Sequence, residues 1–304
     1  MVAVKNKSFK CDADDMGAAK APIFVLLACM MMFALSGCGA SLSNRFALAD
    51  ELAAHDGLQK REYYASPFYV TAFLPPSNNR AATTGRIYIE GDGLAWLNKS
   101  TPSLNPTPID PYALRLAQAD NMADKSAGLE RIYLARPCQY SGWDGEGACP
   151  RKYWTSHRYA PEVVRSYKAL IERIKQERGW QNIEFVGYSG GATLALLLAH
   201  GRDDVAAIRT VAGNLDIDAH SRLHKVSMLP ASLNPANNAQ DYAALPQYHF
   251  VGGEDPIVPQ PIAQSFMAKM GATHCARIET LDGLTHGKGW IDVWPLLLDK
   301  TMPC

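Results

Sequence analysis

The sequence has no excess of charge of either sign: its 304 residues contain 30 Lys and Arg and 30 Asp and Glu. A nucleic-acid partner, which usually requires a basic surface, is therefore not expected. The sequence also lacks internal repeats, low-complexity tracts and a nucleotide-binding loop, because the Gly-rich stretch at 91–93 has no Lys and Ser or Thr beside it. With 47% hydrophobic residues, the chain is expected to form one globular domain with a sizeable core and no cofactor.

Long hydrophobic runs are also absent, and the longest, residues 21–35, is too short for a comfortable membrane span. It follows Lys20 and has the length of a signal-peptide core, so residues 1–37 are predicted to be an export signal. The run ends in Leu35-Ser36-Gly37-Cys38, which resembles the lipobox of bacterial lipoproteins. An ordinary signal peptide with a coincidental cysteine is the alternative.

The lipobox resemblance implies cleavage before Cys38 and lipid attachment to Cys38, with several acyl chains that anchor the protein durably to the membrane. Gly39 stands where an Asp would favour the inner membrane, so the resemblance implies the outer membrane of the cell envelope, facing the periplasm. Residues 38–67 are expected to hold the lipidated cysteine, a tether and an amphipathic helix that ends at Gly57.

Cysteine is scarce, and its distribution agrees with export. Of the seven cysteines, two lie in the signal and one carries lipid, which leaves Cys138, Cys149, Cys275 and Cys304. An even number in an oxidising compartment predicts two disulfides. Pairing Cys138 with Cys149 would close a short loop, and pairing Cys275 with Cys304 would tie the last residue to a late strand, but the sequence leaves the pairing open. Free buried thiols are the alternative.

Strand-like and helix-like segments alternate over residues 68–304, and the fold class is therefore α/β. Strands are predicted at 69–73, 86–90, 129–135, 183–188, 205–211, 248–252 and 276–281. A helix follows Pro161, which suits its first turn, and ends at Gly179. This alternation predicts a mostly parallel central sheet covered by helices on both faces, with a small cap-like insertion at about 214–245.

The sequence Gly187-Tyr188-Ser189-Gly190-Gly191 lies between a predicted buried strand and a predicted buried helix. A serine on such a strand-to-helix turn is exposed at the edge of the sheet, and small residues must flank it. Ser189 is therefore the candidate nucleophile; a glycine-rich structural turn is the alternative.

Ligands of open parallel sheets bind beyond the carboxyl ends of the strands. Asp255 and His286 each follow a predicted strand, and we expect His286 to act as the base and Asp255 to orient it. Asp216 follows another strand and is the competitor for the acid. His249 lies inside a strand and His274 precedes one, so both are interpreted as packing or surface residues.

The order Ser189, Asp255, His286 resembles the α/β-hydrolase superfamily. The resemblance implies an oxyanion hole formed by the backbone N–H groups of Gly190 and Asp92. The superfamily often has His-Gly before the second donor, whereas this sequence has Glu90-Gly91. The segments at 136–140, 153–164 and 212–216 also resemble exported bacterial α/β-hydrolase lipoproteins.

Three aromatic residues after the third predicted strand and a leucine after the fifth are candidates for the substrate pocket. Four residues are assigned to it: Tyr140, Trp143, Trp154 and Leu215. Such a lining suits an apolar acyl or aromatic group, and a surface loop with packed aromatics is the alternative. His220 and His224 have the spacing of a helical metal site, but Ser221 stands where the metalloprotease pattern needs Glu, so no metal is expected.

Together these features predict a serine hydrolase of carboxylic esters or related acyl compounds, with a small-molecule substrate. Two other functions stay open. One is a serine peptidase of the same fold; the other is a non-catalytic binding lipoprotein of the envelope.

Overall fold

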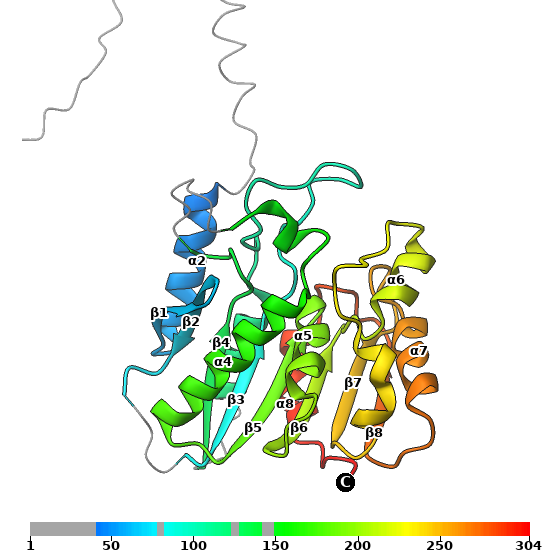
Figure 1. Ribbon diagram of the computed structural model, residues 1–304. Helices are drawn as coiled ribbons and strands as arrows, with labels where there is room; N and C mark the ends of the chain where they lie inside the picture. Colours follow the sequence, from blue (N-terminus) through cyan, green and yellow to red (C-terminus); the bar gives the residue numbers. More distant parts are fainter. Residues whose placement is uncertain (1–40, 78–81, 123–127, 142–148) are drawn as a thin grey trace, which may run out of the picture. The chain divides into compact units, whose positions relative to one another are not determined.

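An eight-stranded sheet runs through the molecule in the order β1-β2-β4-β3-β5-β6-β7-β8 (Figure 1). The computed structural model describes residues 41–77, 82–122, 128–141 and 149–304. Its strands are β1 (Gln59–Ala65), β2 (Phe68–Leu74), β3 (Thr84–Ile89), β4 (Leu129–Leu134), β5 (Asn182–Tyr188), β6 (Val205–Val211), β7 (Gln247–Gly252) and β8 (Ala276–Leu281). β2 pairs antiparallel with β1 and β4, whereas β3 to β8 run parallel, which confirms the predicted mostly parallel sheet.

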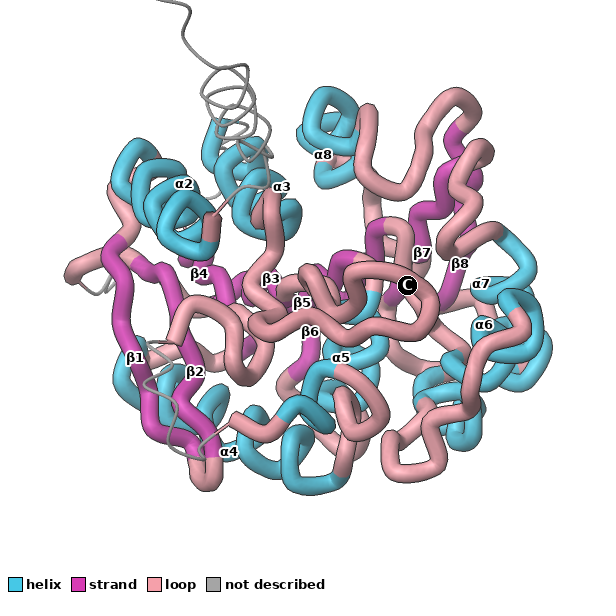
Figure 2. Tube along the Cα trace, turned by 90° about the horizontal axis from the view of Figure 1, so that it is seen from above, coloured by secondary structure: helices cyan, strands magenta, loops and turns pink. Residues whose placement is uncertain are grey.

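Helices cover both faces of the sheet (Figure 2). One face carries α2 (Leu42–His55), α3 (Tyr112–Met122) and α8 (Trp290–Leu298); the other carries α4 (Pro161–Arg178) and α5 (Gly190–Ala199). The structure also contains α6 (Ile217–His224), α7 (Gln260–Met270) and the 3-10 helices η1 (Arg151–Trp154) and η2 (Pro235–Tyr242). A sheet covered in this way buries both faces of its central strands, so these strands are apolar along most of their length.

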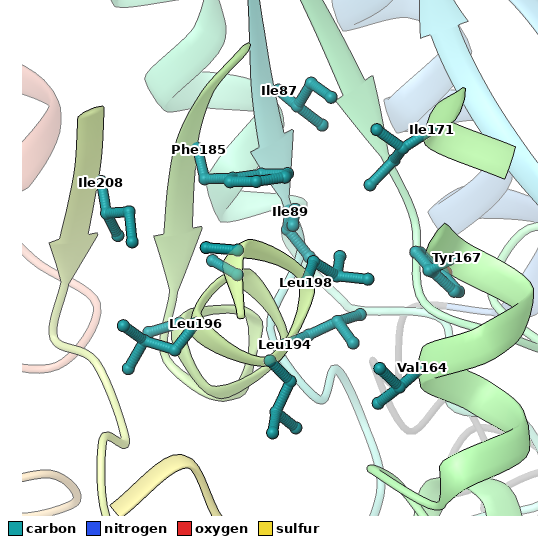
Figure 3. Packing of buried hydrophobic residues seen from close by; sticks show 14 of the residues in the cluster. Ile87, Ile89, Val164, Tyr167, Ile171, Phe185, Leu194, Leu196, Leu198 and Ile208 are labelled. Carbon is teal, nitrogen blue, oxygen red and sulfur yellow. The ribbon is translucent and has the colours of Figure 1, made fainter. Parts of the chain in front are cut away.

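Successive residues of each central strand pack on opposite faces of the sheet. In β3, Ile87 and Ile89 belong to the hydrophobic cluster under α4 and α5, whereas Tyr88 belongs to the cluster under α2, α3 and α8. Figure 3 shows Ile87 and Ile89 on the side of the sheet where Leu198 of α5 lies. Both clusters lie within Ala40–Cys304, which forms one compact unit by itself.

The segment before residue 68 is part of the folded domain, and here the sequence prediction needs correction. The expected amphipathic helix is α2, whose first turn is capped by the side chain of Ser41. β1 was missed: it pairs residue for residue with β2, so the predicted boundary between residues 67 and 68 falls inside a hairpin. Only Tyr63 and Ala65 of this edge strand are buried, and a polar strand of this kind lacks the apolar pattern that would reveal it.

Two disulfides join the cysteine pairs that the sequence suggests. Cys138 is bonded to Cys149, and Cys275 is bonded to Cys304, across sequence separations of 11 and 29 residues. The second bond ties the carboxyl terminus to the residue before β8, so the last residues of the chain are fixed to the sheet.

Residues 1–37, Cys38 and Trp143 lie outside the described residues. Among the residues that the structure describes, no helix combines the length and the hydropathy needed to cross a bilayer.

Candidate active site

Ser189 stands on a sharp turn between β5 and α5. Its φ of 51° and ψ of −119° form a strained conformation that residues with a side chain rarely adopt. A Cβ on Gly187 would lie 2.5 Å from the Cα of Ala192, and one on Gly191 would lie 2.2 Å from the carbonyl oxygen of Ile89. The close approach of the backbone therefore requires glycine at both positions, and the turn holds Ser189 at the carboxyl end of the sheet.

Three side chains from three different loops meet at this edge. The Oγ of Ser189 lies 3.0 Å from Nε2 of His286, and Nδ1 of His286 lies 2.8 Å from Oδ2 of Asp255. Asp255 follows β7 and His286 follows β8, so both lie beyond the carboxyl ends of parallel strands. The structure thus brings the serine, histidine and aspartate selected from the sequence within hydrogen-bonding reach of one another.

Asp255 is held by the backbone that follows it. Its Oδ1 accepts hydrogen bonds from the N–H groups of Ile257 at 2.8 Å and Val258 at 2.9 Å, which leaves Oδ2 for His286. Burial raises the pKa of Asp255, but the hydrogen bond and charge of His286, together with these N–H groups, outweigh burial and hold the pKa below its usual value. Asp255 therefore stays ionised beside the imidazole.

Both carboxylate oxygens of Asp216, the competing candidate for the acid, accept hydrogen bonds from groups other than His286. Its Oδ1 caps α6 and accepts from Asn234 at 2.9 Å, while Oδ2 accepts from Ser265 and Lys269, each at 2.7 Å. Burial raises the pKa of Asp216, but these donors outweigh it and lower the pKa to about 2. The carboxylate fastens the segment after β6 to α7, whereas the partner of His286 is Asp255.

The other histidines occupy different environments. His249 is fully buried in β7 beside Thr210, and burial lowers its pKa to about 3, whereas His274 is exposed. The rings of His220 and His224 lie 4.5 Å apart. Within the described ranges, no group of three or more His, Cys, Asp or Glu side chains is arranged to hold a metal ion.

The two expected oxyanion-hole residues line the same cavity as Ser189, the candidate nucleophile. Gly190 is the first residue of α5, where a backbone N–H has no partner within the helix, and Asp92 lines the same cavity as Ser189. The Asp92 carboxylate accepts from Arg136 at 3.0 Å, from Arg158 and from Tyr159 at 3.0 Å. Burial raises the pKa of Asp92, but the two guanidinium groups outweigh it and hold the pKa at about 2. These contacts fix the loop that carries the Asp92 N–H.

Glu90 stands at the position where the superfamily often has His. Its hydrogen bonds also hold this loop in place. Its Oε1 accepts from the N–H of Gly91 at 2.8 Å, and its Oε2 accepts from the N–H of Ala113 and the hydroxyl of Tyr133, each at 3.2 Å. Burial raises the pKa of this carboxyl to about 8, so it holds a proton at neutral pH. The sequence identified the substitution but not this role, which depends on contacts with α3 and β4.

A cavity of about 640 Å³ lies beside Ser189 and His286. Loops that follow β3, β5, β6, β7 and β8 form its walls, and several side chains give it an apolar part and a polar part: Trp96, Ile109, Ile257, Asp110, Arg158 and His220. The first three are also exposed, so they mark where the cavity meets the surface. Asn214 and His220 come from the predicted 214–245 insertion, which thus forms one wall.

Tyr188 forms part of the cavity wall and links the nucleophile turn to the histidine loop. Its ring stacks on that of Tyr112, with centroids 4.7 Å apart, and its hydroxyl donates to the carbonyl oxygen of His286 at 3.0 Å. The residue beside Ser189 therefore also positions the backbone of His286.

Three of the predicted pocket residues, Tyr140, Trp154 and Leu215, are described by the structure and do not line this cavity. Tyr140 and Leu215 are 1% and 0% exposed and belong to the two hydrophobic clusters, and Trp154 packs against Cys138 and Ala95. Tyr140 and Trp154 therefore face inward, and Trp154 packs beside the disulfide cysteines Cys138 and Cys149. The rule that ligands bind beyond strand ends, applied to the loops after β3 and β7, could have found Trp96 and Ile257 instead.

The parallel sheet with helices on both faces and a serine on the turn after β5 define the α/β-hydrolase fold, and the chain has this fold. No protein-family model matches the sequence, and neither does a curated protein sequence.

Solved structures resemble the chain at low sequence identity. Est1E from Butyrivibrio proteoclasticus has a TM-score of 0.54 at 12% identity, covering 79% of this chain and 95% of its own. The Pyrococcus furiosus esterase Pf2001 has a TM-score of 0.55 at 14% identity, covering 79% and 88%. An alpha-beta serine hydrolase homologue from Coxiella burnetii has a TM-score of 0.50 at 16% identity, covering 79% and 95%. At these identities the likeness defines the fold.

Proposed function

We propose that the protein is a serine hydrolase that cleaves carboxylic ester or related acyl bonds in small molecules. The observation that carries this proposal is the pair of contacts made by His286, 3.0 Å to the Oγ of Ser189 and 2.8 Å to the carboxylate of Asp255. The adjoining cavity, which is partly lined by apolar side chains, is suited to an acyl group. The likeness to esterase structures agrees with this function.

In the first half of the reaction, Ser189 Oγ bonds to the carbonyl carbon as its proton passes to Nε2 of His286. The carbonyl electron pair moves to the oxygen, and the N–H groups of Gly190 and Asp92 stabilise the oxyanion. The bond to the alcohol oxygen then breaks, and that oxygen takes the proton from His286. Asp255 keeps the Nδ1–H of His286 oriented and stabilises its charged form.

In the second half, a water molecule attacks the acyl group on Ser189 while His286 Nε2 accepts its proton. The bond between the acyl carbon and Ser189 Oγ then breaks, and His286 returns the proton to that oxygen. The acid product leaves, and the enzyme regains its starting protonation state.

We also propose that the protein is exported to the cell envelope and anchored through lipid on Cys38. In this proposal it is held at the outer membrane and faces the periplasm. The two disulfides support an oxidising compartment. In cells fed a labelled fatty acid, the wild-type chain is expected to acquire the label and Cys38→Ser to lose it. Equal labelling of both proteins would move the modification away from Cys38.

A fluorophosphonate probe tests the nucleophile. The native protein is expected to be labelled, Ser189→Ala to be unlabelled, and the control Ser100→Ala, at an exposed loop serine, to be labelled like the native protein. Absence of labelling on folded native protein would leave a non-catalytic binding protein. Rates on short nitrophenyl esters and on peptide anilides then separate an esterase from a peptidase, and faster cleavage of the anilides would reject the ester proposal.

A further inference from the structure

Most exposed apolar side chains lie in two segments, residues 96–109 and 223–233, and at Ile257. In the part of the chain that the structure describes, twelve large hydrophobic side chains are exposed, and nine of them form what we call the apolar rim: Trp96, Leu97, Leu104, Ile109, Leu223, Val226, Met228, Leu233 and Ile257. The other three, Tyr64, Tyr69 and Leu296, lie elsewhere. Isolated exposed apolar residues are common, but such a cluster usually marks an interaction surface.

The apolar rim adjoins the cavity. Trp96, Ile109 and Ile257 belong to both the rim and the cavity wall. The segment at 223–233 is joined to Ile257, because Nε2 of His224 in α6 lies 2.8 Å from the carbonyl oxygen of Ile257. Any surface that covers the rim therefore also covers the route to Ser189.

The most exposed leucines of the rim are displayed by an ordered loop. Leu97 and Leu104 are 61% and 68% exposed. The loop between them is held by hydrogen bonds from the Leu97 N–H to the Thr101 carbonyl at 2.8 Å and from the Leu94 N–H to the Pro106 carbonyl at 3.0 Å. The hydrogen-bonded backbone thus holds the loop in a conformation that exposes these side chains to water. Exposure costs free energy that burial in an apolar phase would recover.

Exposed charge in these segments and beside Ile257 is nearly balanced. The exposed cations are Lys99, Arg222 and Lys225, and the exposed anions are Asp110 and Glu254. A surface of this kind does not select a strongly charged partner, so apolar contact must supply most of the binding.

The start of the described chain lies at the edge of the folded domain that carries the cavity. Arg45, in the first turn of α2, donates from Nη1 to the carbonyl oxygen of Thr107 at 2.6 Å, next to the wall of the cavity, and Figure 1 shows α2 beginning at this edge. Cys38 precedes Ser41 by three residues, a distance of at most about 11 Å along the chain. The proposed lipid on Cys38 is therefore attached only a short length of chain from this edge.

We propose that the apolar rim docks on the surface of a lipid bilayer and that the site takes amphiphilic ester substrates from that bilayer. This inference rests on the proposed hydrolase function for its substrate and on the proposed anchor for its location. The docking itself depends only on the rim. Leucine, tryptophan and isoleucine side chains enter the interface, and the cavity opens toward the lipid.

Binding is tested without the anchor and without turnover. The chain from Gly39 carrying Ser189→Ala retains the whole compact unit Ala40–Cys304, and it is mixed with phosphatidylcholine vesicles and separated by flotation. Adding Leu97→Ser and Leu104→Ser is expected to weaken partitioning by about tenfold or more, since two apolar side chains are lost from the interface. The matched control Leu296→Ser, at another highly exposed leucine, is expected to partition like the parent.

Three results would overturn the docking proposal. The parent chain stays unbound; the rim variant floats like the parent; or the parent forms a dimer that the rim substitutions dissociate, which would make a second copy the occupant. Equal melting temperatures of the rim variant and the parent ensure that the comparison concerns the surface.

Turnover by the full mature chain separates this inference from the proposed function. The rim variant is expected to hydrolyse a water-soluble nitrophenyl ester at the parent rate and a long-chain ester held in vesicles about tenfold more slowly. Equal rates of the two proteins on the vesicle ester would reject the inference while leaving the hydrolase in place. No hydrolysis of either ester by the parent, with vesicle binding intact, would reject the hydrolase and leave the docking surface.

Discussion

The two aspartates that follow strands near the site differ in what they contact, and this decides their roles. One oxygen of Asp255 accepts from two backbone N–H groups, and the other contacts His286. The oxygens of Asp216 instead accept from the first turn of α6 and from Asn234, Ser265 and Lys269. An ionised partner on Nδ1 selects the histidine tautomer that can accept a proton at Nε2. The proposed reaction therefore uses the first carboxylate, whereas the second stabilises the fold.

Asp255→Asn is therefore expected to lower kcat on a soluble ester by about 10⁴-fold, since an amide favours the wrong tautomer. Asp216→Asn is expected to change kcat by less than about threefold but to lower the free energy of unfolding by about 1–3 kcal/mol, since Lys269 loses its partner. Steady-state kinetics and thermal unfolding of both variants measure these effects. If Asp216→Asn were the variant that lost turnover, the acid would belong to the loop after β6.

Glu90 makes stability depend on pH in a direction unusual for a carboxyl. Its pKa rises from 4.5 to about 8 on folding because it is buried. Between these values the folded state holds a proton that the unfolded state has released, so stability falls as pH rises from about 4.5 to 8.

Glu90→Gln keeps the shape and removes the titration. Relative to wild type, the variant should gain stability as pH rises from 5 to 9, by up to about 4 kcal/mol at 1.36 kcal/mol per pKa unit. Urea unfolding at several pH values measures the difference. A difference that stays constant with pH would show that Glu90 does not hold this proton.

At the scale of elements, the unit formed by β5, the serine turn and α5 depends on how closely two backbones approach. A methyl group on Gly191 would lie 2.2 Å from the carbonyl oxygen of Ile89 and 2.7 Å from that of Glu90, and neither backbone atom can move without distorting β3. Gly179 is different: its φ of 76° strains any other residue, but nothing lies within 4 Å of a Cβ there.

Gly191→Ala is accordingly expected to lower the free energy of unfolding by about 3 kcal/mol or more, or to prevent folding. Gly179→Ala, after the end of α4, should lower it by only about 1 kcal/mol, the cost of the left-handed conformation. Chemical unfolding of the two variants makes the comparison. Similar losses in both would mean that backbone strain, and not the close approach to β3, governs the turn.

The sequence predicts α4, β5 and α5 well because the signals for these elements are local. Pro161 and Gly179 bound α4 as expected, and the apolar runs of β5 and α5 enclose Ser189. β1 shows where local signals end: its residues are mostly polar, and only the pairing with β2 makes them a strand.

At the scale of the whole molecule, the two disulfides close loops of different length and should contribute unequally. By the chain-entropy relation, the Cys275–Cys304 bond, with a sequence separation of 29, is worth about 3.6 kcal/mol, and the Cys138–Cys149 bond, with a separation of 11, about 2.8 kcal/mol. Pairwise Cys→Ala variants are expected to lose stability in that order under oxidising conditions.

Thermal unfolding with and without dithiothreitol provides the control for these variants. Reductant should lower the melting temperature of the wild type, and it should have no effect on a variant that lacks all four cysteines. A wild type that is insensitive to dithiothreitol at its melting temperature would indicate that these bonds add little to the fold.

The sequence by itself determined the α/β sheet, the serine turn and the pair Asp255 and His286, because periodicity, glycine spacing and the position of a residue after a strand are written along the chain. The tertiary structure alone decided which side chains form the cavity. Tyr140 and Trp154 turn inward while Trp96 and Ile257 face the cavity, since a loop's path depends on what it packs against and not on a repeating pattern. The partners of Glu90 and Asp92 were decided in the same way: they come from β4, α3 and the segment before α4, which only folding brings together.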